Sequence, residues 1–180
     1  LAASGCRHLT GRAGARVLIG GLGMGFTVRA ALDVLPSDAQ VVVAELVPEV
    51  QAWNEQVLGH LAGHPLRDPR VRVQLGDALQ VVRATPDAWD AILLDVDNGP
   101  AEFAAEGNDQ LYSRAGLYSL NRALRRTGVL AVWSAWEDRA FARRLQASGF
   151  AVTLERARGH KGRGARHFVY LATPKGRPLA

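Results

Sequence analysis

This chain of 180 residues has little cysteine and methionine and no long apolar run, and each shortage narrows what it can be. A single cysteine, Cys6, cannot form an internal disulfide, so we expect a reducing, cytoplasmic location. No apolar run approaches the ~18–20 residues that a membrane helix requires, and nothing at the start resembles a signal peptide. The one methionine is Met24, so we expect further residues before Leu1 in the natural protein.

Acidic residues are absent from the C-terminal segment, which makes the basic charge of the chain a local property. Residues 156–180 carry +7, so the rest of the chain contributes 5 − 7 = −2 to the formal net charge of +5. We expect the glycine-rich stretch 156–166 to be a solvated hairpin loop, and we do not expect a nucleic-acid partner. Segment 95–109 has acids without Lys or Arg, which favours a cationic partner.

The most informative stretch is an apolar strand that runs into a glycine turn. The strand 16–20 is followed by Gly21, Gly23 and Gly25, after which a helical pattern begins. Glycines reach positive φ and let a ligand approach the backbone without meeting a Cβ. The dinucleotide fingerprint would require a third small residue where Phe26 stands. The spacing therefore argues against NAD and favours an adenosyl-sulfonium ligand, and a turn that binds nothing is the alternative.

Three acids follow the ends of three predicted strands. Glu45 is placed to accept hydrogen bonds from both ribose hydroxyls, or to serve as an acid at the start of the next helix. Asp77 is placed to accept from an adenine amino group, or to cap the helix that starts at Ala78. Asp95 ends an apolar strand, where ligands bind in open α/β sheets. Three such acids after a glycine turn are hard to explain by capping alone.

The alternation of strand and helix patterns predicts one α/β domain over residues 16–172, with a lead-in at 1–15 and a tail at 173–180. Because parallel strands need crossover helices, we expect a Rossmann-like three-layer sandwich with a mainly parallel, seven-stranded sheet. The last two strands have no helix between them, so we expect an antiparallel pair with the C-terminal strand at the sheet edge. The strands are expected near 16–20, 40–45, 71–75, 90–95, 128–134, 150–155 and 166–172, and the helices near 26–35, 48–62, 78–85, 114–126 and 137–148.

The order of these signals resembles the class I S-adenosylmethionine-dependent methyltransferase fold, and within it the spermidine synthase (polyamine aminopropyltransferase) family. The likeness covers residues 16–172 and is carried by segments 17–29, 68–71, 76–78, 90–95, 99–100, 111–112 and 128–130 together with Glu45. It implies S-adenosylmethionine or its decarboxylated form as co-substrate. The nucleotide contacts that it implies are Gly21, Gly23, Met24, Gly25, Glu45, Asp77 and Asp95.

The resemblance also implies the catalytic residues. Asp95 matches the acid that orients and deprotonates the attacking amine, and Asp97 would support it and help to bind the substrate. The implied function is transfer of an alkyl (aminopropyl) group to a small, cationic amine acceptor. A small-molecule methyltransferase and a non-catalytic adenosyl-nucleotide-binding protein remain as alternatives, because the fold hosts all three.

The chain departs from the family pattern at three points. Met24 stands where the family carries an aspartate that holds the ammonium of decarboxylated S-adenosylmethionine, and methionine cannot pair that group. Asp97 follows Asp95 by two positions, where the family spacing is three. The amine-binding residues of the family's amino-terminal β-domain are not in this chain. Either that domain precedes Leu1 in the natural protein, or the chain is a shortened relative with a different acceptor.

Tyr112 and Trp133 are further candidates for lining the substrate pocket, although each also fits ordinary packing. Leu111 and Leu117 around Tyr112 resemble a packed helix, and large aromatic residues at strand ends are often core.

No metal is expected in this protein. The pair of acids at 95 and 97 also resembles that of metal-dependent O-methyltransferases, but those enzymes need a further Asp-Asn pair, which is missing after Trp133. The histidines lack metal-ligand spacing with the lone cysteine. The sequence is compatible with a homodimer.

Overall fold

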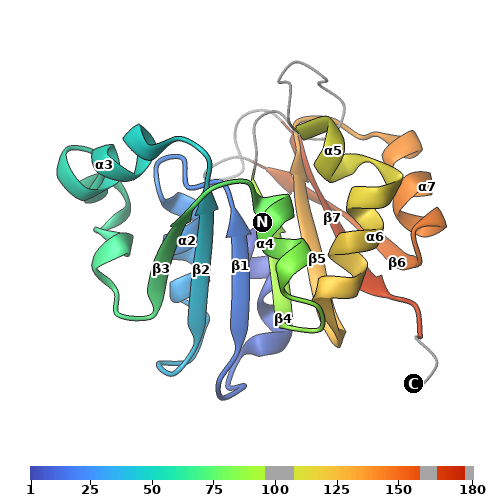
Figure 1. Cartoon of the computed structure of the whole chain (residues 1–180), viewed down its shortest axis with the longest axis horizontal. Helices are drawn as coiled ribbons and strands as arrows, with labels where there is room; N and C mark the ends of the chain where they lie inside the picture. Colours follow the sequence, from blue (N-terminus) through green and yellow to red (C-terminus); the bar gives the residue numbers. More distant parts are fainter. Residues whose placement is uncertain (96–107, 159–165, 177–180) are drawn as a thin grey trace.

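A seven-stranded sheet forms the middle layer of the protein (Figure 1). The computed structural model describes residues 1–95, 108–158 and 166–176. The strand order is β3-β2-β1-β4-β5-β7-β6, in which β1 to β5 pair in parallel and β7 runs antiparallel to both β5 and β6. The strands are β1 Arg16–Gly20, β2 Gln40–Glu45, β3 Val71–Leu75, β4 Trp89–Leu94, β5 Leu124–Ser134, β6 Phe150–Arg158 and β7 Arg166–Pro174.

Helices cover both faces of the sheet, so the predicted three-layer α/β fold is confirmed. Helices α4, α6 and α7 lie in front of the sheet in Figure 1, and α1 and α2 lie behind it. The helices are α1 Ala2–Gly5, α2 Phe26–Leu32, α3 Pro48–Gln56, α4 Ala78–Ala84, α5 Asn108–Tyr112, α6 Arg114–Ala123 and α7 Arg139–Ala147, with short 3₁₀ turns η1 Arg7–Leu9, η2 Gly59–Ala62 and η3 Pro65–Arg67.

The last two strands form the expected antiparallel pair, but the outermost strand is β6 and not the C-terminal β7. Strand β7 lies between β5 and β6, where Val169, Tyr170 and Ala172 are almost completely buried. Strand β6 carries Glu155 and Arg156, and charged side chains suit an edge because they oppose pairing with another chain. Burial of the more apolar strand therefore explains the order.

The expected helix over residues 48–62 is divided into α3 and η2. The helix α3 ends before Val57, and a left-handed Gly63 then closes η2. The expected helix over 114–126 also ends early, because Leu124 adopts an extended conformation and pairs with Trp89 at the start of β5.

The lead-in residues pack against the sheet. Cys6 and Leu9 are fully buried. At the amino end of β4, the buried carboxylate of Asp90 lies 2.8 Å from the guanidinium of Arg12 and 2.7 Å from that of Arg125. These ion pairs join the lead-in to β4 and β5.

We expect the Cys6 thiol to be unreactive in the native protein. Burial raises its pKa to about 12, so the reactive thiolate is scarce at neutral pH. An aromatic disulfide reagent at pH 8 should label Cys6 at once in denaturant. In the native protein, it should label Cys6 only at the rate of unfolding. Immediate labelling of the native protein would contradict the burial of this side chain.

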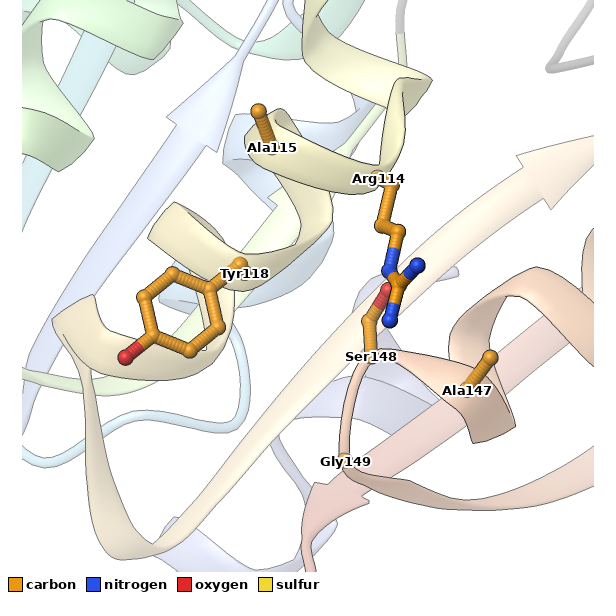
Figure 2. A pocket seen from close by; sticks show the side chains of 6 residues that line it. All are labelled: Arg114, Ala115, Tyr118, Ala147, Ser148 and Gly149. Atoms are coloured by element: carbon orange, nitrogen blue, oxygen red, sulfur yellow. The ribbon is translucent and has the colours of Figure 1, made fainter.

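A groove of about 630 Å³ opens between α6 and α7 (Figure 2). Its lining residues are Arg114, Ala115, Tyr118, Ala147, Ser148 and Gly149. Figure 2 shows Arg114 reaching from α6 toward Ser148 at the end of α7, where a cation is favourable for the helix dipole. No acid is among these lining residues.

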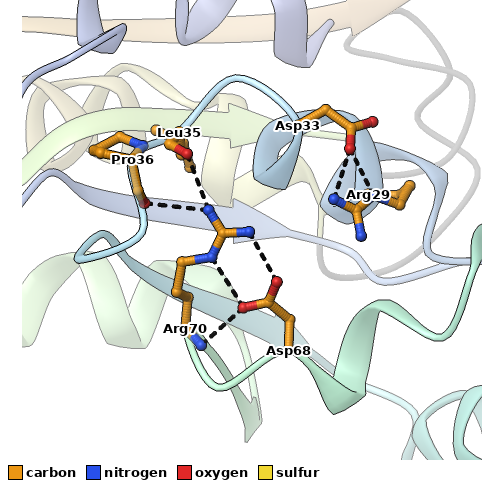
Figure 3. A network of polar contacts seen from close by, with 6 residues as sticks. All are labelled: Arg29, Asp33, Leu35, Pro36, Asp68 and Arg70. Atoms are coloured by element: carbon orange, nitrogen blue, oxygen red, sulfur yellow. Dashed lines mark hydrogen bonds and ion pairs between the residues drawn. The ribbon is translucent and has the colours of Figure 1, made fainter.

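An ion pair beside β3 holds the chain after α2 against the start of that strand (Figure 3). The guanidinium of Arg70 donates to Asp68 Oδ1 at 2.9 Å and to Oδ2 at 2.8 Å, and it also donates to the carbonyls of Leu35 and Pro36. The hydrogen bonds from Arg70 lower the pKa of Asp68 to about 2.

We expect this pair to produce an acid-dependent loss of stability. Because folding depresses the pKa of Asp68, its contribution is complete above about pH 4 and is lost as the pH falls toward 2. Asp68→Asn should lower the free energy of unfolding by about 1–2 kcal/mol at pH 7 and flatten the pH dependence between pH 4 and 2. Urea titrations at each pH measure this. The control is Asp33→Asn, which breaks the exposed Arg29 pair in the same view and should cost less than about 0.5 kcal/mol. Parallel pH curves for wild type and Asp68→Asn would contradict the prediction.

Candidate nucleotide and transfer site

The segments that the sequence singles out meet at the carboxyl edge of the parallel strands. Three backbone hydrogen bonds join them beyond the strand ends. Gly21 N–H donates to Ala44 O at 2.9 Å, Gly76 N–H donates to Glu45 O at 2.8 Å, and Asp95 N–H donates to Gly20 O at 3.0 Å. The glycine turn and the three strand-end acids therefore share one edge of the sheet.

The glycine turn adopts backbone conformations that require glycine. Gly21, Gly23 and Gly25 have φ values of 91°, 51° and 80°. A Cβ on Gly25 would lie 2.9 Å from Pro65 Cγ, so the turn is packed closely on that side. A Cβ on Gly23 would meet nothing within 4 Å, and the Met24 side chain is half exposed. One side of the turn is thus packed and the other is open to a ligand.

Glu45 fastens the glycine turn to the end of β2. The residue is only 7% exposed, and its Oε2 accepts from Leu22 N–H at 2.8 Å while its Oε1 accepts from Val47 N–H at 2.9 Å. Carboxylate oxygens each accept more than one hydrogen bond, so both retain acceptor capacity for ribose hydroxyls. The bond to Leu22 is a contact that neither sequence interpretation of Glu45 anticipated.

Asp77 caps α4. Its Oδ1 accepts from Leu79 N–H at 2.8 Å, which is the capping role weighed from the sequence. The residue follows Gly76 at the end of β3, and no donor among the described residues bonds to its Oδ2. A capping bond through one oxygen leaves the other free to accept from an adenine amino group.

Asp95 is exposed at the end of β4, and its Oδ2 accepts from Thr27 Oγ1 at 2.5 Å. Thr27 lies in the first turn of α2, so this bond links the predicted catalytic acid to the helix after the glycine turn. Sequence reasoning did not identify Thr27, although its position directly after the turn was a usable signal. Asp97, the second predicted acid, lies outside the described residues.

The two aromatic candidates have different surroundings. Tyr112 is 5% exposed and packs edge-on against Phe141 with ring centroids 5.5 Å apart, so its ring belongs to the core. Trp133 is partly exposed near the carboxyl end of β5, and its ring lies 5.2 Å from that of His167. Of these two residues, Trp133 is thus the one that is partly exposed to solvent, near the end of β5.

Asn54 of α3 also contacts the glycine turn, and the sequence analysis did not single it out. Its Nδ2 donates to Gly23 O at 2.7 Å, and the residue is 2% exposed.

In the part of the chain that the structure describes, no three His, Cys, Asp or Glu side chains gather as a metal site would require. None of the described helices has the length and apolar character needed to cross a membrane.

Residues 6–149 match the spermine/spermidine synthase domain. The chain belongs to the spermine/spermidine synthase family. A curated relative of this family, the polyamine aminopropyltransferase of Synechococcus sp. (strain JA-2-3B'a(2-13)), is 37% identical over 90 residues, which are 48% of this chain and 28% of that protein. Polyamine aminopropyltransferase 2 of Streptomyces coelicolor is 36% identical over 121 residues, which are 66% of this chain and 21% of that protein. This spermine/spermidine synthase domain therefore spans less than a third of these relatives.

Solved structures support the fold of this family member. Spermidine synthase from Thermotoga maritima superposes with a TM-score of 0.70 at 18% identity, over 92% of this chain and 54% of that one. Human methyltransferase-like protein 13, solved in complex with SAH, superposes with a TM-score of 0.68 at 19% identity, over 96% and 78% of the two chains. The fold is thus shared by spermidine synthases and methyltransferases.

This spermine/spermidine synthase family member has no acid within its glycine turn. The residue between Gly23 and Gly25 is Met24. Glu45 bonds to the turn at Leu22, and Asp95 bonds to Thr27 in the first turn of α2. An ammonium group over the turn would therefore find no carboxylate in the turn itself.

Proposed function

We propose that this protein binds S-adenosylmethionine or its decarboxylated form and transfers an alkyl group from the sulfur to a small, cationic amine acceptor. The observation that carries the proposal is the convergence of the open glycine turn, Glu45, Asp77 and Asp95 at one sheet edge. Family membership supports the same reaction class. A buried thiol and the lack of a disulfide fit the cytoplasm as its location.

The residues at this edge have separate roles in the proposed reaction. Glu45 holds the ribose hydroxyls and Asp77 the adenine amino group, which fixes the nucleoside. Asp95 receives the proton of the amine acceptor, and its bond to Thr27 fixes the direction of one carboxylate oxygen. The amine lone pair then forms a C–N bond as the C–S bond breaks. The electron pair of the C–S bond stays on sulfur, and the sulfonium becomes a neutral thioether.

Most of the catalysis comes from positioning, because the sulfonium group is already activated. Alignment of the amine with the carbon on sulfur is worth about 7–11 kcal/mol when the approach is well oriented. The acidic segment 95–109 favours a cationic acceptor, although most of it lies outside the described residues.

Methyl transfer is the second candidate, and Met24 is the observation that favours it. Without an acid in the turn, the protein has no side chain there that pairs the ammonium of the decarboxylated donor. Both reactions break a bond to the same sulfonium centre, so the same residues would serve either of them.

The products distinguish the candidates. The protein is incubated with each donor and a set of diamines, and the nucleoside formed is identified by mass spectrometry. Methylthioadenosine formed from the decarboxylated donor indicates aminopropyl transfer, methylthioadenosine formed from S-adenosylmethionine indicates transfer of the aminocarboxypropyl group, and S-adenosylhomocysteine indicates methyl transfer. Asp95→Asn should retain donor binding and lose turnover. Binding without either product would make the protein a nucleotide-binding protein, and no binding of either donor would overturn the proposal.

A further inference from the structure

The glycine turn uses only part of its backbone donors inside the protein. Gly21 N–H donates to Ala44 O, Leu22 N–H to Glu45 Oε2 and Gly25 N–H to Leu22 O. The N–H groups of Gly23 and Met24 donate to no acceptor among the described residues. Two adjacent backbone donors of the turn are therefore left for a partner other than the described part of the protein, and the Met24 N–H belongs to the same peptide group as the Gly23 carbonyl.

Asn54 fixes the peptide group to which the Met24 N–H belongs. Its Nδ2 donates both of its hydrogens, to Gly23 O at 2.7 Å and to Val50 O at 2.9 Å. A flipped amide would place Oδ1 against these two carbonyl oxygens, so the amide has one favourable orientation. Because Asn54 is 2% exposed, water does not compete for these bonds.

The direction of the Met24 N–H follows from peptide geometry. Across a trans peptide the C=O and the next N–H point to opposite sides, and no described peptide bond is cis. Asn54 draws the Gly23 carbonyl toward α3, so the Met24 N–H points away from α3. A Cβ on Gly23 would meet nothing within 4 Å, so this part of the turn has room for a ligand.

We propose that Asn54 is a positioning residue that directs the Met24 N–H at the substituent on the ligand sulfur. This inference rests on the proposed function and narrows its donor class. An N–H group needs an acceptor, which the carboxylate of S-adenosylmethionine provides and the ammonium of the decarboxylated form does not. Asn54 thereby favours a donor that retains its carboxylate.

The test compares two stable nucleosides that differ in this substituent. S-adenosylhomocysteine carries the carboxylate and methylthioadenosine does not. Asn54→Asp and Asn54→Ala should weaken binding of S-adenosylhomocysteine by about tenfold and leave that of methylthioadenosine within about threefold, as measured by calorimetry. Val50→Ala is the matched control, because it removes apolar packing from the same helix without changing the amide, and it should affect both ligands equally.

A second measurement needs only the wild type, so it holds even if the Asn54 variants do not fold. The sequence has one methionine, so ¹⁵N-methionine labelling gives one internal backbone amide resonance. This resonance should shift downfield with S-adenosylhomocysteine and not with methylthioadenosine. Equal losses for both nucleosides, no loss for S-adenosylhomocysteine, or equal resonance shifts would overturn the positioning role alone. A wild type that binds neither nucleoside would overturn the proposed function as well.

Discussion

Replacing Glu45 by alanine should weaken the binding of S-adenosylhomocysteine by about 1.5–3 kcal/mol, the range for lost hydrogen bonds to a charged group. Two effects add in this variant. The ribose hydroxyls lose their acceptor, and the N–H groups of Leu22 and Val47 lose the carboxylate that orders the glycine turn. Calorimetric titration of the purified variant measures the change, and thermal unfolding shows whether the fold persists.

The controls separate the ribose contact from the ordering of the turn. Glu49→Ala removes an exposed acid from the first turn of α3 and should leave affinity unchanged. In the wild type, 2′-deoxy- and 3′-deoxyadenosine should bind less tightly than adenosine, and Glu45→Ala should abolish this difference. If the variant binds every adenosyl ligand as tightly as the wild type does, Glu45 is not part of the site and serves the turn only.

Replacing Met24 by aspartate should shift the donor preference toward decarboxylated S-adenosylmethionine by about a hundredfold or more. The new carboxylate attracts an ammonium that has no carboxylate beside it and repels the carboxylate of S-adenosylmethionine, and like charges brought together cost several kcal/mol. The wild type should bind the two donors within about tenfold, a difference of about 1.4 kcal/mol.

The measurement is a titration of both donors into both proteins. Met24→Leu is the matched control, because it changes the shape of an exposed side chain without adding charge, and its ratio should equal that of the wild type. A wild-type preference of a hundredfold or more for the decarboxylated donor would contradict this prediction and indicate an ordinary aminopropyltransferase. An unchanged ratio in Met24→Asp would show that the open side of the turn does not face the donor's tail.

Much of the fold could be predicted because it follows from local periodicity. Strand β4 is an unbroken apolar run apart from Asp90, and all six of its residues are buried, as expected for a parallel strand covered on both faces. The glycine turn was predictable for the same reason, since its neighbours in sequence form the strand and the helix that it joins. Family membership then followed from the order of these motifs.

The site was only partly predictable. The strand ends predicted from the sequence correctly place Glu45, Asp77 and Asp95 at one edge of the sheet, because parallel strands bring their carboxyl ends together. Their bonding partners could not be predicted, since each carboxylate has several acceptor positions and the choice depends on which N–H or O–H approaches it. Thr27 reaches Asp95 across 68 residues of sequence.

The sequence by itself determined the α/β class, the parallel sheet, the glycine turn and the absence of an acid at Met24, because each is a property of residues adjacent in the chain. The tertiary structure alone decided that β7 lies between β5 and β6, that Glu45 bonds to Leu22, and that Asn54 donates to the Gly23 carbonyl. These features depend on contacts between distant segments, such as Gly23 and Asn54, which are 31 positions apart, and no local period encodes them. They form only when burial has removed water as the competing partner.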